Sequence, residues 1–226
     1  MTKWLASVQS LEEAKILLPV LPDILDMKDP SKGALGVLPV ETVADIVNMI
    51  DGRCLTSATI GDLPMQADVI SKAMIAMAKS DVDYIKIGLF PESKLTECIK
   101  TLAETVKNLE KPVIAVLFAD KSIDLDIISL LKTSGFTGVM IDTAIKNGQG
   151  LLDHWDNSQL IHFVNTVQQH EMLCGVAGAL KIEDIAELKP LNADYLGFRS
   201  ALCKQQQRKE NLRLPLARQV KEVIEG

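Results

Sequence analysis

Short apolar runs alternate with amphipathic segments along the whole chain. Eight runs have the length and composition of β-strands: Trp4–Val8, Asp23–Lys28, Leu55–Ile60, Tyr84–Leu89, Val113–Ala119, Gly138–Thr143, Leu173–Gly178 and Tyr195–Ser200. Between them, apolar residues recur three and four positions apart. This spacing predicts a first helix capped by Ser10, and then helices over Val40–Ile50, Ala67–Ala78, Lys94–Leu109, Leu125–Thr133, Ser158–Gln169, Ile182–Leu188 and Leu216–Ile224.

The strand–helix repeat predicts an α/β fold, the (β/α)8 TIM barrel. Most of the predicted strands are continuously apolar, as expected for a parallel sheet that is covered on both faces. Eight strand–helix units in 226 residues fit a small barrel. A doubly wound open sheet is the alternative, but it usually has fewer strands and a Gly-rich phosphate motif, and the chain contains no G-x-G-x-x-G or G-x-x-x-x-G-K-[ST]. No linker or low-complexity tract interrupts the repeat, so residues 1–226 are predicted to form a single domain.

Composition and charge exclude several classes of protein. The chain has 24 Lys and Arg against 30 Asp and Glu, so we expect no basic surface that binds the phosphates of nucleic acid. Only 4% of the residues are aromatic, which leaves few side chains on which bases could stack. The longest apolar run, Val113 to Ala119, is far shorter than the roughly 20 residues of a membrane span. The first residues have no apolar signal core. We therefore expect a cytoplasmic protein without a nucleic-acid or membrane partner, which self-associates as barrels of this size commonly do.

Cysteines and histidines give no sign of a metal or redox site. The four cysteines, Cys54, Cys98, Cys174 and Cys203, form no C-x-x-C pair and are expected to be reduced packing residues. His162 and His170 are eight residues apart on a predicted helix, but no carboxylate pattern supports them. We expect no metal and no cofactor.

Charged residues gather at the ends of the second, fourth and sixth predicted strands. Asp26 and Lys28 point to one face of their strand, Lys86 lies between apolar neighbours, and Asp142 and Lys146 follow one another at a third strand end. Alternate strands of a barrel contribute to the same interior layer, and barrel enzymes keep their chemistry at these strand ends. The five side chains are therefore predicted to meet near the barrel axis.

Such a cluster has two interpretations. Asp26–Lys28 and Asp142–Lys146 could be salt bridges at the barrel mouth, with Lys86 a lone residue whose ammonium reaches solvent. Alternatively, crowded cations in a partly dry site lower the pKa of one lysine, so that its neutral amine attacks a carbonyl and forms a Schiff base. A second lysine and the aspartates then transfer protons.

The last two strands are expected to supply a phosphate site. Backbone N–H groups after Gly178, at Ala179, and around Ser200 and Ala201 are placed where barrels commonly bind phosphate, and Arg199 is expected nearby. Gly178 could instead merely permit a tight turn.

A further loop follows the third predicted strand. Thr59 and Asp62 in this loop are candidates for hydrogen bonds to a polyhydroxy substrate, or else for plain turn chemistry.

Five blocks of sequence resemble one enzyme family. They are Asp23-Ile-Leu-Asp26-Met-Lys28-Asp-Pro30-Ser-Lys32-Gly33-Ala-Leu-Gly36, Ser57-Ala-Thr-Ile-Gly-Asp-Leu-Pro64, Asp83-Tyr-Ile-Lys86-Ile-Gly88-Leu, Ile141-Asp142-Thr-Ala-Ile-Lys146-Asn-Gly148 and Gly197-Phe-Arg199-Ser-Ala-Leu-Cys203-Lys204. In this order they resemble the (5-formylfuran-3-yl)methyl phosphate synthases, also called 4-(hydroxymethyl)-2-furancarboxaldehyde-phosphate synthases. The resemblance covers roughly residues 5 to 225 and is carried by all five blocks together.

The resemblance implies a TIM-barrel lyase of methanofuran biosynthesis. Such an enzyme condenses two molecules of glyceraldehyde 3-phosphate into the furan phosphate and releases phosphate and water. By position, Lys28 is then the Schiff-base lysine and Lys86 the proton acceptor, while Asp26, Asp142 and Lys146 complete the proton network.

The chain departs from the family's pattern in two places. The family usually has Gly-Gly-Asp-Arg where this chain has Gln205-Gln206-Gln207-Arg208, and Gly-Ser where it has Gly178-Ala179. The second departure removes a hydroxyl from the expected phosphate site.

The sequence is also compatible with two other functions. The first is that of another phosphate-binding barrel, either an aldolase or a decarboxylase. The decarboxylases have the motif Asp-x-Lys-x-x-Asp, but this chain has Ser31 at the position of the last Asp. A non-catalytic sugar-phosphate-binding subunit is the other, although a binder has no need of an amine at each of three strand ends.

Overall fold

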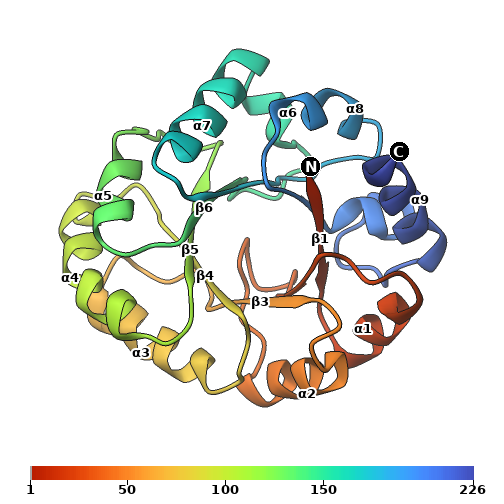
Figure 1. The fold of residues 1–226 in the computed structure, drawn as a ribbon, viewed down its shortest axis with the longest axis horizontal. Helices are drawn as coiled ribbons and strands as arrows, with labels where there is room; N and C mark the ends of the chain where they lie inside the picture. The colour runs from red at the N-terminus through yellow and green to blue at the C-terminus, as the bar shows by residue number, and fades with distance from the viewer. Residues whose placement is uncertain (1) are drawn as a thin grey trace.

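A computed structural model describes residues 2–226 as a closed barrel of eight parallel strands, with the helices outside it (Figure 1). Each strand pairs with the next, and β8 pairs with β1. The strands are β1 (Lys3–Val8), β2 (Ile24–Met27), β3 (Leu55–Thr59), β4 (Tyr84–Gly88), β5 (Val113–Phe118), β6 (Gly138–Asp142), β7 (Leu173–Val176) and β8 (Tyr195–Phe198). The predicted TIM barrel is confirmed.

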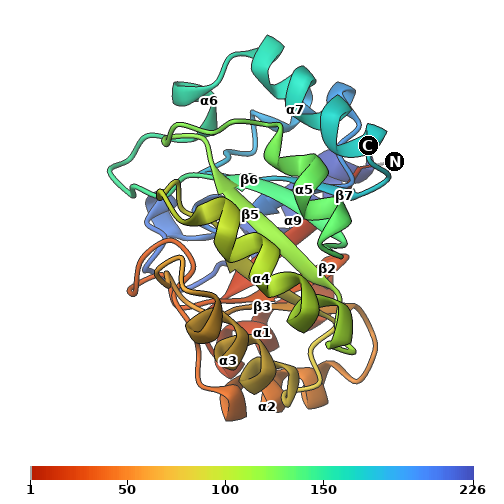
Figure 2. The same cartoon turned by 90° about the vertical axis from the view of Figure 1, so that its left-hand side faces the viewer.

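Helices cover the outer face of the barrel, and in the view turned by 90° α4 lies across β5 (Figure 2). They are α1 (Leu11–Leu17), α2 (Val40–Ile50), α3 (Ala67–Ala78), α4 (Leu95–Asn108), α5 (Ile127–Thr133), α6 (Leu151–His154), α7 (Asn157–Gln169), α8 (Ile185–Leu188) and α9 (Leu214–Glu225). Four short 3-10 turns are η1 (Leu18–Val20), η2 (Lys189–Leu191), η3 (Ser200–Leu202) and η4 (Lys204–Gln206). No helix within residues 2–226 is both long and apolar enough to cross a membrane.

Among the α-helices, α8 and α6 differ most from the sequence-based expectation. Ser10 caps α1 as predicted, because its side chain accepts a hydrogen bond from the Glu13 N–H. The helix predicted from Ile182 begins only at Ile185, since Asp184 accepts the Lys181 N–H and holds the preceding residues in a turn. Helix α6 was not predicted, because four residues are too few to show a helical period.

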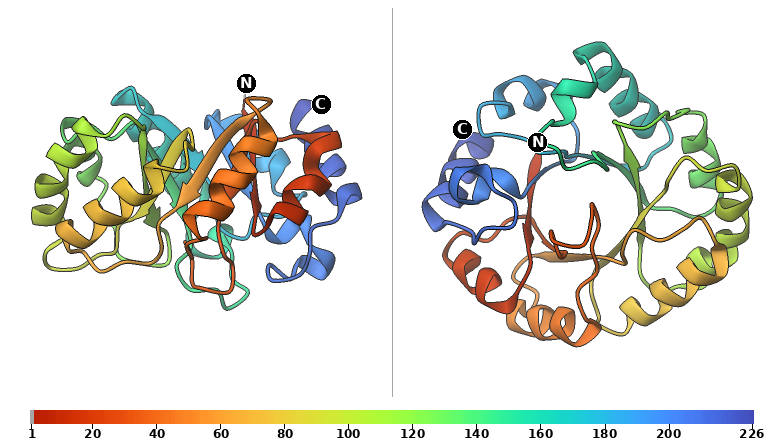
Figure 3. Two further views of the ribbon diagram at one scale, coloured as in Figure 1. Left: turned by 90° about the horizontal axis from the view of Figure 1, so that it is seen from below. Right: turned by 180° about the vertical axis from the view of Figure 1, so that it is seen from behind.

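The alternation of side chains in the strands separates an outer core from an inner one. Apolar side chains such as Trp4 and Leu25 pack between the sheet and the helices, whereas Leu5 and Met140 belong to a second cluster inside the barrel. In the strand register, Asp26 stands beside Ser7 of β1 and Ser57 of β3. A polar layer therefore lies inside the barrel. The segments after β2, β6 and β8 project from one end of the barrel (Figure 3, left).

Candidate functional site

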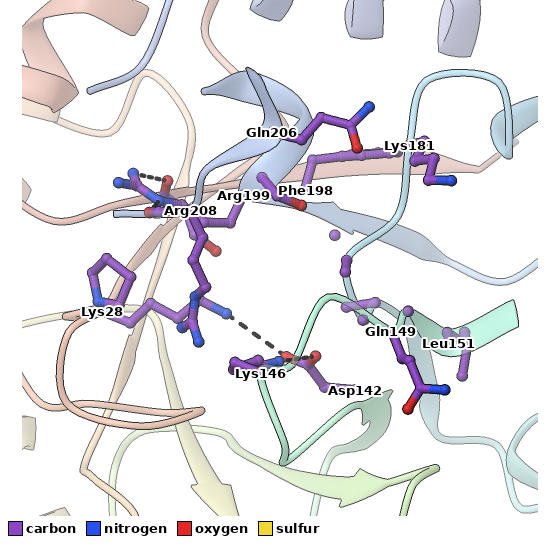
Figure 4. A pocket seen from close by; sticks show the side chains of 18 of the residues that line it. Lys28, Asp142, Lys146, Gln149, Leu151, Lys181, Phe198, Arg199, Gln206 and Arg208 are labelled. Atoms are coloured by element: carbon purple, nitrogen blue, oxygen red, sulfur yellow. Dashed lines mark hydrogen bonds and ion pairs between the residues drawn. The ribbon is translucent and has the colours of Figure 1, made fainter. Parts of the chain in front are cut away.

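A cavity of about 610 Å³ opens among the loops at the carboxyl ends of the strands (Figure 4). Lys28, Lys86, Asp142 and Lys146 line it, together with residues that follow β7 and β8. The first three of these side chains are almost completely buried. The structure thus brings four of the five predicted charged residues to one cavity.

Asp26, the fifth predicted residue, lies behind the cavity wall rather than in it. Its carboxylate is fully buried and accepts hydrogen bonds from Ser7 Oγ at 2.9 Å, Ser57 Oγ at 2.6 Å and Lys86 Nζ at 3.1 Å. Burial raises the pKa of this carboxyl, but the positive charges of Lys86 and Lys28 outweigh it and lower the pKa overall. Asp26 therefore stays ionised and fixes the position of the Lys86 amine.

Asp142 forms the second anionic centre of the site. Its Oδ1 accepts hydrogen bonds from Lys146 Nζ at 3.0 Å and from the Thr143 N–H at 2.7 Å, and its Oδ2 lies 3.7 Å from Lys28 Nζ. Burial opposes ionisation here too, yet the Lys146 and Lys28 charges and the Thr143 N–H hold the pKa well below its usual range. Lys146 also donates to Thr143 Oγ1 at 3.1 Å, so its amine is held at two points.

Lys28 is the least constrained of the three lysines. Its Nζ donates no hydrogen bond to any residue of the described chain, and its only ion pair is the 3.7 Å approach to Asp142. Burial lowers the pKa of Lys28 to about 8, with Lys86 and Lys146 acting in the same direction and Asp142 and Asp26 against it. At pH 7 about one amine in ten is then neutral, compared with about one in 3,000 for an ordinary lysine.

This pairing differs from the simple salt bridges that the sequence allowed. Asp142 and Lys146 do pair, but Asp26 bonds Lys86 rather than Lys28, so Lys86 is not a lone residue. Asp26 thus bonds Lys86 and Asp142 bonds Lys146. The amine of Lys28 lines the cavity without a hydrogen bond of its own. That arrangement suits a nucleophile flanked by two groups that can exchange protons with it.

Gly178 and Ala179 line the opposite part of the cavity with backbone in the left-handed region. Their φ angles are +117° and +51°, and a Cβ added at Gly178 would lie 3.1 Å from Leu151 Cβ. The Gly178 carbonyl accepts the Leu151 N–H at 2.8 Å, which ties this loop to the start of α6. Ser200 lines the cavity as well, whereas Ala201 is buried and does not.

Arg199 lines the cavity, but its side chain is bonded to protein groups. Its two Nη atoms donate to the Glu13 carboxylate at 2.5 and 3.2 Å. The remaining N–H groups donate to the carbonyls of Ser7, Arg208 and Glu210 at 3.1, 2.7 and 3.1 Å. The guanidinium thus anchors the segment after β8 to β1 and α1 and is not free for a phosphate.

The side chains of Thr59 and Asp62 are also hydrogen-bonded within the protein, and neither residue lines the cavity. Thr59 donates to the Gly36 carbonyl at 3.0 Å, and Asp62 accepts the N–H groups of Ala34 and Leu35 at 2.8 and 2.9 Å. Both residues shape the loop after β2. The plain turn chemistry that the sequence allowed is present at these residues, and a contact with a polyhydroxy substrate stays a prediction.

Sequence reasoning missed several residues that line the cavity: Gln149, Lys181, Gln206, Gln207 and Arg208. Most lie in the segments after β6 and β8, where no periodic pattern indicates which side chains turn inward. The one available signal was the departure from the family's pattern at Gln205–Arg208. Among residues 2–226 no group of three or more His, Cys, Asp or Glu side chains is placed to hold a metal ion.

The chain is similar to curated proteins over most of its length. Residues 4–221 match the family described as 4-HFC-P synthase. A protein of Methylorubrum extorquens that is provisionally named (5-formylfuran-3-yl)methyl phosphate synthase is 39% identical over 92% of this chain and 85% of its own length. The (5-formylfuran-3-yl)methyl phosphate synthase of Methanococcus aeolicus is 33% identical over 91% and 92%, and that of Methanocaldococcus jannaschii is 33% identical over 88% and 89%.

Solved structures share the barrel at much lower sequence identity. Phosphoribosyl anthranilate isomerase from Thermus thermophilus superposes with a TM-score of 0.71 at 12% identity, covering 100% of this chain and 98% of that one. KGPDC from Streptococcus mutans gives a TM-score of 0.69 at 11% identity, covering 100% and 98%. At such identities the likeness extends to the fold alone.

Proposed function

The chain belongs to the 4-HFC-P synthase family, and from this premise we propose that it is a lyase that condenses two molecules of glyceraldehyde 3-phosphate. The product is 4-(hydroxymethyl)-2-furancarboxaldehyde phosphate, and the atoms balance when one phosphate and two water molecules leave. The observation that carries the proposal is the buried Lys28 amine, whose pKa is lowered to about 8 and which makes no hydrogen bond within the described chain.

Lys28 starts the reaction as a nucleophile. Its neutral amine attacks the aldehyde carbon of one triose phosphate, forming a C–N bond while the carbonyl electrons move to oxygen. The oxygen takes up protons and leaves as water, which gives an iminium ion. Loss of the proton from the neighbouring carbon then yields an enamine, whose carbon attacks the aldehyde of the second triose phosphate.

Two lysine–carboxylate pairs are placed to move these protons. Lys86 with Asp26 and Lys146 with Asp142 each combine an amine with a carboxylate that stays ionised. Lys86 first gives a proton to the oxygen that leaves as water, and its neutral amine then accepts the proton lost in the enamine step, while its bond to Asp26 holds it in place. Lys146 and Asp142 serve the oxygen atoms that leave as water or phosphate.

Backbone N–H groups and lysine side chains bind the phosphate groups of the substrates. The N–H groups that follow Gly178, at Ala179 and around Ser200, supply donors at the place where barrels commonly hold phosphate. Although the whole chain has a net charge of −6, Lys28, Lys86, Lys146 and Lys181 all line this cavity. A cationic mouth on an acidic protein attracts the anionic substrates.

The furan product suits a biosynthetic role. We propose that it supplies the furan part of methanofuran or of a related one-carbon cofactor, and that the enzyme works in the cytoplasm as a homo-oligomer. No bound cofactor is needed, since the amine itself activates the carbonyl.

The experiment is to incubate the purified protein with glyceraldehyde 3-phosphate and follow two signals together. The expected result is a furan-aldehyde absorbance that appears in step with one inorganic phosphate released for each product. The same protein with a keto sugar phosphate, assayed for carbon dioxide, tests the decarboxylase alternative. Phosphate release without a furan, or consumption of the keto sugar phosphate instead, contradicts the proposal.

A further inference from the structure

We propose that Arg208 binds the phosphate group of one of the two triose phosphates, in a subsite distinct from the backbone donors after β7 and β8. The inference rests on the proposed function, because only a reaction of two phosphorylated substrates requires two phosphate subsites in one cavity. Two phosphate dianions repel each other strongly in a partly buried site, so separate positions with separate counter-charges are needed.

The two arginines at the cavity are bonded in opposite ways. Arg199 uses all its N–H donors within the protein, as described above. Arg208 makes a single side-chain hydrogen bond, from Nη2 to the Gly33 carbonyl at 3.1 Å, and no ion pair with any residue between 2 and 226. A guanidinium has five N–H donors in a planar fork that fits two phosphate oxygens. Most of the Arg208 donors are therefore available to a ligand.

The carboxylates whose charges act on Arg208 already have partners in the protein. Asp142 bonds Lys146, Asp62 accepts two backbone N–H groups of the loop after β2, and Asp29 accepts groups of its own loop. Burial lowers the pKa of Arg208, and the charge of Asp142 acts in the opposite direction across the cavity. A half-buried cation among lysines, without a carboxylate of its own, is stabilised when an anion binds beside it.

The position of Arg208 is fixed by its neighbours. The Arg199 Nε donates to the Arg208 carbonyl, and Glu13 holds Arg199, so the backbone at Arg208 is tied to β1 and α1. Figure 4 shows the Arg208 side chain on the same side of the cavity as Lys28, with Lys181 and Gln149 across from it. A phosphate on Arg208 therefore lies on the Lys28 side, apart from the donors that follow Gly178.

The test uses glycerol 3-phosphate, which carries the phosphate but has no carbonyl and cannot form a Schiff base. Binding to the unmodified protein and to three variants is measured by isothermal titration calorimetry. Arg208→Gln removes the charge and the fork. Arg208→Lys keeps the charge but loses the planar fork. Lys209→Gln removes an equal charge from an exposed neighbour that also lines the cavity, and serves as the matched control.

We expect Arg208→Gln to abolish one of two binding events or to weaken it at least about 30-fold, the range for a partly buried charge-assisted pair. Arg208→Lys should fall between this variant and the unmodified protein, and Lys209→Gln should stay within about threefold of the unmodified protein, as expected for an exposed charge. If Arg208→Gln binds like Lys209→Gln, the subsite is refuted. If Arg208→Gln does not fold, unweakened binding by Arg208→Lys refutes it instead.

The result separates the subsite from the proposed function, because glycerol 3-phosphate does not react. A protein that makes the furan but binds this ligand independently of Arg208 keeps the function and loses the subsite. A protein that needs Arg208 for binding but makes no furan keeps a phosphate subsite and loses the function.

Discussion

Lys28 Nζ lies 3.7 Å from Asp142 Oδ2, whereas Lys146 Nζ lies 3.0 Å from Oδ1 of the same carboxylate. One lysine is thus hydrogen-bonded to Asp142 and the other is only near it. The nearby charge keeps part of the Lys28 amine protonated, but no hydrogen bond directs its nitrogen away from the cavity. The two lysines therefore have different roles although they share one aspartate.

Replacing Lys28 with arginine tests the need for an amine at this position. Lys28→Arg keeps the positive charge next to Asp142 but stays protonated at all working pH values. We expect furan formation to fall to the background rate, with an unchanged circular dichroism spectrum and a melting temperature close to that of the unmodified protein. Retained activity in this variant excludes Lys28 as the Schiff-base residue.

The pH dependence of the first step follows from the Lys28 pKa of about 8. Only the neutral amine reacts, so the rate of Schiff-base formation should rise about tenfold per pH unit between pH 6 and 7 and level off above about pH 8. A lysine with its ordinary pKa gives a rate that still rises beyond pH 9. Single-turnover reduction of the imine over pH 6–10 distinguishes the two profiles.

Removing the charge of Asp142 should change this profile in a defined direction. The Asp142 carboxylate raises the pKa of Lys28, so Asp142→Asn should lower that pKa and move the midpoint of Schiff-base formation below about 8. The same variant loses a proton-transfer group, and overall turnover should fall by about 10²–10⁴-fold. The matched control is Asp153→Asn, which also changes a carboxylate that lines the cavity. A midpoint that stays the same or rises shows that Asp142 does not act on Lys28.

The Glu13–Arg199 pair should contribute to stability rather than to chemistry. Both side chains are buried, at 2% and 6% exposure, so removing one leaves the other charge without a counter-charge. We expect Glu13→Ala to lower the free energy of unfolding by about 3–5 kcal/mol, and the double variant with Arg199→Ala to lose less than the sum of the single variants. Urea unfolding measures both. Glu225→Ala, which breaks the exposed pair with Lys221, is the control and should have little effect.

The fold could be predicted from the sequence because strand and helix periods are local. Helices α2 and α3 begin and end at the predicted residues, since their apolar faces and the flanking turns are both visible in the sequence. Strands β7 and β8 end earlier than predicted. The chain leaves the strand ladder before Gly178, which has a left-handed backbone, and before Arg199, whose side chain is bonded within the protein.

The site could be predicted only in part, for a physical reason. Asp26, Lys86 and Asp142 lie within strands, so the two-residue period and the parallel register place them inside the barrel. The partners of each charge depend on contacts between segments distant in sequence. Arg199 meets Glu13 of α1, and Arg208 meets Gly33 of the loop after β2. No local pattern shows which of two nearby arginines is bonded within the protein and which faces the cavity.

Chemical trapping of the imine tests the role of Lys28 most directly. The protein is treated with sodium borohydride in the presence of glyceraldehyde 3-phosphate, and the modified residue is located by intact-mass analysis and peptide mapping. A Schiff base on Lys28 predicts one reduced adduct per chain, on Lys28, and none in Lys28→Arg. An adduct on Lys86 or Lys146, or no adduct while the furan forms, contradicts it.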